Sequence, residues 1–172
     1  MSYLSHSNPA FWDGSEYTPH PYVPKPQFCF LRLPHCPDRQ LHQPGLPTDA
    51  GYDIHISDDI EVPPNLDGDP YRARTGLILI PPEDSWVGIY ARSSLSKKGL
   101  ILANSVGVVD SGFTGELQLL LYNVRSEPVR IAAGSALAQA VLHKIYDVAL
   151  NELKADPRTV KRGGIGSTGG YG

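Results

Sequence analysis

The sequence of 172 residues is poor in the features that mark secreted, membrane or nucleic-acid-binding proteins. It has two cysteines, Cys29 and Cys36, which cannot form a disulfide framework and whose spacing fits no metal knuckle. No apolar run approaches the ~20 residues of a membrane span. The first residues lack the cationic start and apolar stretch of a secretory signal. We therefore expect a reduced, intracellular protein of the cytoplasm or nucleus with no membrane partner.

An excess of basic residues is also absent. The chain has 15 Lys and Arg against 18 Asp and Glu, a formal net charge of −3. A binder of the phosphate backbone normally carries a positive patch or stripe. We therefore expect no nucleic-acid partner.

Long segments of helical periodicity are missing too, and short β-type runs take their place. At most a turn or two of helix fits "SSLSKKG", and 17 glycines and 16 prolines supply many turns. Many short strands at near-regular spacing predict an all-β fold, a sandwich, jelly roll or barrel. The expected strand segments are residues 28–33, 50–56, 75–80, 85–94, 100–110, 116–124 and 136–148.

Composition divides the chain into three parts. Residues 1–27 are rich in Pro, Ser, Tyr and His without periodicity, which is typical of a tail. Residues 28–150 carry the strand segments and form the expected domain. Residues 151–172 form a C-terminal arm that ends in glycine-rich "KRGGIGSTGGYG", where glycine offers nothing to bury.

The stretch "YARSSLSKKGL" ends an apolar run with Arg92, Ser93 and Ser94. An arginine fork beside two hydroxyls can clamp an oxyanion. The alternative is a helix cap at Ser93 or Ser94 with a surface arginine.

Two further polar residues stand within apolar strand segments. Asp53 in "AGYDIHI" is either an edge or turn residue or a hard oxygen ligand, direct or through water, for a cation carried by a phosphate substrate. Gln139 in "GSALAQAVLHK" needs partners if it is half-buried, and an edge strand is one explanation.

The stretch "NSVGVVDSGFTGE" places a carboxylate, Asp110, among valines and glycines. It is either the first residue of a β-turn or a base held in a pocket to deprotonate a water. Phe113 offers a flat face for a sugar or base, and Asn104 can add amide hydrogen bonds. Glycine at 107 and 115 lets backbone approach a ligand closely.

The tail "RGGIGSTGG" is either disordered or a flexible lid. In a lid, glycine amides, Ser167 and Thr168 could wrap phosphates, and Arg162 could neutralise them.

Taken in order, the five stretches resemble the motifs of the homotrimeric dUTPase family, from about residue 28 to the C-terminus. The resemblance implies a jelly-roll β subunit, a threefold trimer and active sites shared between subunits. It implies Mg²⁺-dependent hydrolysis of dUTP to dUMP and diphosphate, a reaction that limits uracil incorporation into DNA and supplies dUMP for dTMP synthesis.

The same resemblance assigns roles by position. Asp110 would activate the attacking water, Phe113 would pack under the deoxyribose, and Asp53 would support Mg²⁺ through its water shell. Asn104 and the backbone of the hairpin would read the uracil edge. The implied substrate-binding residues are Arg92, Ser93, Ser94, Asn104, Gly107, Val108, Val109, Asp110, Phe113, Gln139, Arg162, Ile165, Gly166, Ser167 and Thr168.

The sequence departs from the family pattern at three positions. The family usually has Tyr where this chain has Phe113, and often has a second acid at Gly112. It usually has Phe in the lid, where this chain has Ile165 and a shorter spacer after the arginine. The expected consequence is weaker cover of the base, or replacement of the ring by Tyr171.

Two other functions are compatible with parts of the sequence. The dCTP deaminases have a similar second motif, but they need an Arg ahead of the third-motif Asp and a Glu in the next strand, where this chain has Val108 and Leu120. A catalytically weak scaffold that binds proteins is the second alternative.

Overall fold

Strands provide nearly all of the regular structure in the computed structural model, which describes residues 27–41, 49–65 and 68–155. Residues 1–26 of the expected tail, the residues of the lid and Tyr171 lie outside the described residues. The elements in chain order are β1 (Cys29–Arg32), β2 (Tyr52–His55), β3 (Ile60–Val62), β4 (Tyr71–Arg74), β5 (Leu77–Ile80), β6 (Ser85–Ala91), α1 (Ser93–Lys97), β7 (Leu100–Leu102), β8 (Gly107–Asp110), β9 (Gln118–Asn123), β10 (Val129–Ile131) and β11 (Ala136–Lys144).

Every expected strand segment contains a strand, and the all-β prediction is confirmed. The sequence predicts one run over residues 100–110, but a turn splits it into β7 and β8. In that turn Ser105 has a φ of 58°, and its N–H donates to the Leu102 carbonyl at 3.1 Å. Sequence reasoning missed β3, β4 and β10. These strands have only three or four residues and carry charges, so their alternation of apolar and polar residues is too short to be recognised among the neighbouring Pro and Asp residues.

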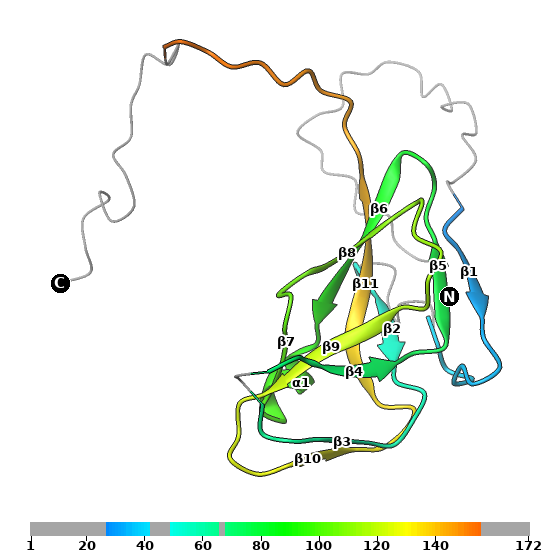
Figure 1. Ribbon diagram of the computed structural model, residues 1–172. Coiled ribbons are helices and arrows are strands. Elements are labelled where there is room, and N and C mark those ends of the chain that lie inside the picture. The colour runs from blue at the N-terminus through cyan, green and yellow to red at the C-terminus, as the bar shows by residue number, and fades with distance from the viewer. Residues whose placement is uncertain (1–26, 42–48, 66–67, 156–172) are drawn as a thin grey trace, which may run out of the picture.

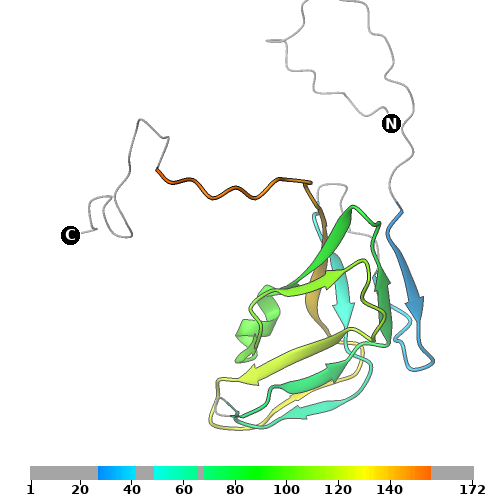
Figure 2. The same ribbon diagram turned by 45° about the horizontal axis from the view of Figure 1, so that its top comes forward.

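Within the described part of the chain, the strands form four antiparallel sheets, whose arrangement Figures 1 and 2 show. The largest has the order β2-β11-β6-β8, and the second has the order β4-β9-β7. Two-stranded sheets pair β1 with β5 and β10 with β3. Neighbours within the sheets are distant in sequence, as in a jelly-roll-like fold, and β11 near the C-terminus pairs with β2 and β6.

Alternation along the strands divides the core from the outer surface. Val87 and Ile89 of β6 are buried, as are Leu119 and Leu121 of β9. Together with the other inward residues they form one apolar cluster. Each fully buried aliphatic side chain contributes about 1.5–3 kcal/mol, so this cluster fixes the register of the sheets.

Asn123 at the end of β9 is a polar residue in the core, with 1% exposure. Its amide nitrogen donates to the carbonyls of Val62 at 2.9 Å and Glu127 at 2.8 Å. Its amide oxygen accepts from the Arg125 N–H at 2.9 Å. A side chain that satisfies three backbone groups explains why an amide is tolerated there.

Asn123→Ala is expected to lower the free energy of unfolding by about 2–4 kcal/mol, because buried backbone groups lose their partners. Urea unfolding measures the change. Glu127→Ala is the control, since its exposed side chain takes no part in these bonds. Equal effects of the two substitutions would contradict this account of Asn123.

Among the described residues, no helix is long and apolar enough to cross a membrane.

Candidate active site

The first polar cluster lies at one end of the four-stranded sheet. Arg92 Nη1 lies 2.5 Å from Asp53 Oδ2, and both side chains are about 40% exposed, at 38% and 40%. An ion pair this exposed adds little stability. The pair instead holds a guanidinium at a fixed place on the surface, where the remaining N–H groups can bind an anion.

Arg92 also sets the start of α1. It is the N-cap residue, with φ −76° and ψ 150°, and it makes no side-chain cap bond. The alternative interpretation, a cap at Ser93 or Ser94, is therefore wrong, because both serines lie inside the helix. Ser93 is exposed beside Arg92, and Ser94 is partly exposed.

Gln139 lies on β11 directly between Asp53 of β2 and Tyr90 of β6. Since β11 is an inner strand of the sheet, an edge position does not explain this glutamine. The structure thus brings Asp53, Arg92, Ser93 and Gln139 together at one end of the sheet.

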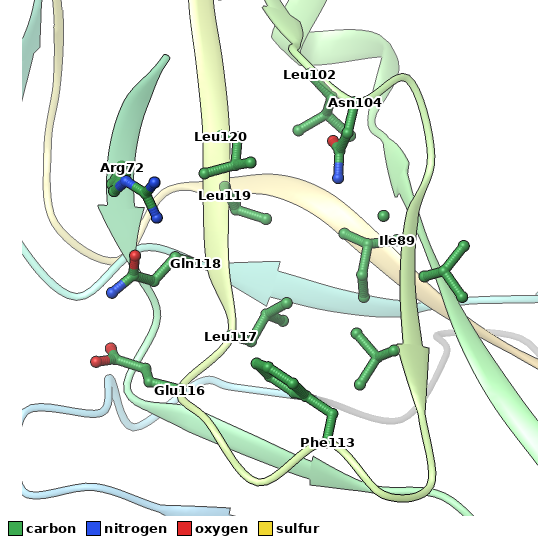
Figure 3. Close-up of a pocket in the computed structure, with 13 residues that line it drawn as sticks. Arg72, Ile89, Leu102, Asn104, Phe113, Glu116, Leu117, Gln118, Leu119 and Leu120 are labelled. Atoms are coloured by element: carbon green, nitrogen blue, oxygen red, sulfur yellow. The ribbon is translucent and has the colours of Figure 1, made fainter. Parts of the chain in front are cut away.

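A pocket of about 240 Å³ forms the second part of the site (Figure 3). Five residues proposed from the sequence line it, namely Asn104, Gly107, Val108, Val109 and Phe113. Ile89, Leu102, Leu117 and Leu119 give it apolar walls, and the remaining lining residues are Arg72, Glu116, Gln118 and Leu120. An apolar pocket with a few polar groups is typical of a small-molecule site.

Phe113 reaches into this pocket from the turn after β8. In Figure 3 its ring points towards Leu117, while Asn104 lies at the opposite end. A Cβ on Gly115 would lie 2.8 Å from Phe113 Cζ, and one on Gly107 would lie 3.2 Å from Asn104 Nδ2. Both glycines therefore leave room for these two side chains, which line the pocket.

Asp110 is the last residue of β8 and is exposed. Its carbonyl accepts the Phe113 N–H at 3.1 Å, which is the bond of a β-turn. The interpretation as a turn residue is confirmed by this bond, and the carboxylate is left accessible, so its role as a base stays a prediction. Asp110 borders the pocket but is not among the residues that line it.

Glu116 was missed by sequence reasoning. Its Oε1 accepts from the Gly76 N–H and contacts His35 Nε2, each at 2.9 Å, and Arg74 Nε lies 3.6 Å from Oε2. Burial raises its pKa, but the hydrogen bonds from His35 and Gly76 and the charges of His35 and Arg74 outweigh it, so the pKa lies below the usual value.

The signal for this wall of the pocket was available in the sequence. In "ELQLLLY", alternate positions place Glu116, Gln118 and Leu120 on one side of β9, and Arg72 lies opposite Leu120 on β4. Figure 3 shows Arg72, Gln118 and Glu116 on the far side of β9 from Phe113. Because the leucines of this segment give the pattern of a core strand, this polar row was not recognised.

The two parts of the site are far apart within one chain. Asp110 lies opposite Trp86 at the start of β6, whereas Arg92 follows the end of that strand. At about 3.3 Å per residue, the six steps from Trp86 to Arg92 span roughly 20 Å. One chain therefore does not bring its own carboxylate to its own cationic cluster.

Comparison with known proteins now identifies the family. A family model described as dUTPase matches residues 38–169. The chain belongs to the dUTPase family. A deoxyuridine 5'-triphosphate nucleotidohydrolase of Thermobifida fusca is 34% identical over 140 residues, which cover 78% of this chain and 75% of the relative.

Solved dUTPase structures share the fold. The Staphylococcus bacteriophage 80alpha dUTPase with dUPNHPP has a TM-score of 0.70 and 21% identity, over 83% of this chain and 98% of the phage chain. A mutant dUTPase from phage phi11 of S. aureus, in which a structural Mg(II) ion is coordinated, has a TM-score of 0.62 and 20% identity, over 75% of this chain and 97% of the phage chain. The jelly-roll-like prediction is thereby confirmed. The lid residues Arg162, Ile165, Gly166, Ser167 and Thr168 fall within the family match but outside the described residues.

Glu116→Gln tests whether the contacts of the Glu116 carboxylate stabilise the fold. Because the folded pKa of Glu116 is lowered, its carboxylate stabilises the fold above its usual pKa of 4.5 and loses this effect as the pH falls through the folded value. The stability advantage of the wild type over the variant should therefore be present above pH 4.5 and shrink as the pH falls below it.

Urea unfolding at several pH values measures this difference. Glu83→Gln, at an exposed loop position, corrects for replacing a carboxylate by an amide. A difference between wild type and Glu116→Gln that stays constant with pH would show that the carboxylate is not held by its neighbours.

Proposed function

We propose that this chain is a dUTP diphosphatase, which hydrolyses dUTP to dUMP and diphosphate. The observation that carries the proposal is the pocket lined by Asn104, Gly107 and Phe113 beside the accessible Asp110, on a chain of the dUTPase family. Hydrolysis of dUTP also requires a binding site for the triphosphate, and in this proposal the polar cluster at Arg92 supplies it.

The pocket suits a deoxynucleoside. Asn104 and the backbone of the hairpin from Gly107 to Phe113 carry donors and acceptors that match the edge of uracil. The Phe113 ring, 46% exposed, offers a face for the deoxyribose and leaves little space for a 2′-hydroxyl. A narrow hairpin also has little room for the methyl group of thymine.

The polar cluster suits the phosphates. Arg92 supplies a planar fork, Ser93 and Ser94 supply hydroxyls, and Gln139 supplies an amide. In this assignment Ser93 faces the bridging oxygen that leaves with diphosphate. The lid residues Arg162, Ile165, Gly166, Ser167 and Thr168 are proposed to close over the bound nucleotide.

The chain's residues fit a magnesium ion that is carried by the substrate. Among the described residues, no group of three or more His, Cys, Asp or Glu side chains could hold a metal. Asp53 has Oδ2 engaged by Arg92, and its other oxygen can accept a hydrogen bond from a metal-bound water. Mg²⁺ commonly binds through one or two carboxylates, several waters and substrate phosphates. When bound, it neutralises triphosphate charge.

Hydrolysis needs one proton acceptor. A water oxygen forms a bond to the α-phosphorus while the bond from that phosphorus to the bridging oxygen breaks, and diphosphate leaves. Asp110 takes the proton of the attacking water. Its exposure at the end of a strand leaves it free to reach that water.

We further propose that the active protein is a homotrimer. The separation of roughly 20 Å between Asp110 and Arg92 along β6 supports a site completed by a second chain, because the base and the phosphate-binding cluster must act on the same nucleotide. A closed threefold ring gives three equivalent sites of this kind.

Asp110→Asn is expected to lower kcat for dUTP by about 10²–10⁴-fold, because the amide keeps the shape and cannot accept the proton. Binding of dUMP should change little. Release of diphosphate and calorimetric binding measure the two effects. Asp58→Asn, an exposed carboxylate away from both parts of the site, is the control.

A variant that keeps near-wild-type turnover would exclude Asp110 as the base. Release of ammonia from dCTP would favour a deaminase, and no turnover of dUTP, dCTP, dTTP or UTP by the wild type would favour a binding scaffold.

The trimer is tested by mass in solution. Three chains of 18.7 kDa give a particle of about 56 kDa in light scattering or sedimentation, at concentrations where the enzyme is active. Full activity of an 18.7 kDa particle would contradict a site shared between chains.

A further inference from the structure

The outer face of the four-stranded sheet carries a row of three residues across adjacent strands. His143 of β11 lies directly opposite Trp86 of β6, and Trp86 lies directly opposite Asp110 of β8. Figure 1 shows these strands side by side. Val87 and Val109, the next pair, are buried, so Trp86 and Asp110 share the opposite, outer face.

The Trp86 ring is held in place by His143, its neighbour on the other side. It stacks on the His143 ring with centroids 4.3 Å apart and an interplanar angle of 15°. Nε2 of His143 lies 3.0 Å from the Tyr90 hydroxyl. A Cβ on Gly88 would lie 2.5 Å from Tyr90 Cε2, so the missing side chain at 88 makes room for the Tyr90 ring. These contacts leave the indole little freedom to rotate.

The Asp110 carboxylate has no comparable support of its own. Within the described residues, its side chain takes part in no hydrogen bond or ion pair. Val108, two residues earlier on the same face, is 62% exposed. Directly opposed residues of an antiparallel pair have Cβ atoms about 4.5–5.5 Å apart. Trp86 is therefore a large side chain directly opposite the carboxylate on the same face of the sheet.

We propose that Trp86, held by the stack on His143, is a positioning residue for Asp110. The indole blocks one side of the carboxylate and restricts its rotamers, so that the carboxylate faces the attacking water. A base displaced by about 1 Å can cost 10²-fold in rate. The role acts on the chemical step and leaves nucleotide binding to the pocket and the Arg92 cluster. This inference rests on the proposed function, in which Asp110 is the base.

The kinetic test compares Trp86→Ala, Trp86→Phe and His143→Ala. We expect Trp86→Ala to lower kcat about 10-fold or more with KM within about threefold, because only the position of the base changes. Trp86→Phe should recover most of the rate, since a flat ring remains. His143→Ala should lower kcat by less than Trp86→Ala, because the indole stays but is no longer held.

Tyr146→Ala is the matched control, an aromatic truncation just after β11 at a residue that is 75% exposed. It should leave kcat and KM unchanged. Wild-type kcat in Trp86→Ala would overturn the proposal. Equal losses in Trp86→Ala and Trp86→Phe, accompanied by lower stability or loss of the oligomer, would also overturn it and assign Trp86 a structural role.

A spectroscopic test does not depend on turnover. Trp12 is the only other tryptophan, so Trp12→Phe leaves Trp86 as the sole indole fluorophore. In that background Asp110→Asn should shift the Trp86 emission, because a charge beside the ring is removed. His143→Ala should shift it as well. An emission spectrum unchanged by Asp110→Asn would show that the two side chains do not interact, whether or not the chain hydrolyses dUTP.

Discussion

The pairing of β6 with β11 on one side and with β8 on the other determines where every proposed site residue of this sheet lies. The register with β11 sets Gln139 beside Tyr90, near the end of β6 that leads to Arg92. The register with β8 sets Asp110 beside Trp86, at the start of β6. A shift of one residue in either pairing would turn these side chains into the core. The buried Val87 and Ile89 oppose such a shift, since each would then be exposed.

Much of this arrangement could be predicted from the sequence. Asp110, Phe113 and Asn104 fall within one hairpin, so the local pattern was enough to place them around a turn. Asp53 and Arg92 are 39 residues apart, and their ion pair depends on which strands are neighbours. Composition and periodicity do not encode that topology. The resemblance to a known family supplied it, because five motifs in a fixed order imply one sheet arrangement.

Other features depend on contacts between segments that are distant in the sequence. Glu116 was only the first residue of an expected strand segment, and its contacts with Gly76 and His35 join segments 40 and 81 residues away. The stack of Trp86 on His143 joins two strands 57 positions apart in sequence, each with an ordinary pattern. Such pairings depend on register across strands, which alternation within one strand cannot give. The alternative of a helix cap at Ser93 or Ser94 was wrong, because it rested on the general preference for serine at caps, whereas the helix here has Arg92 as its N-cap residue.

The central claim is that one chain supplies the carboxylate and another supplies the phosphate cluster of each site. Mixing chains that carry Asp110→Asn with chains that carry Arg92→Ala, after joint unfolding and refolding, tests it most directly. In an equal mixture about a quarter of the sites would combine an intact Asp110 with an intact Arg92, so about a quarter of the wild-type rate should return. Mixing chains that carry Arg92→Ala with chains that carry Gln139→Ala should restore no activity, because one and the same chain supplies both residues to a site. A mixture of Asp110→Asn and Arg92→Ala no more active than its components would contradict the account.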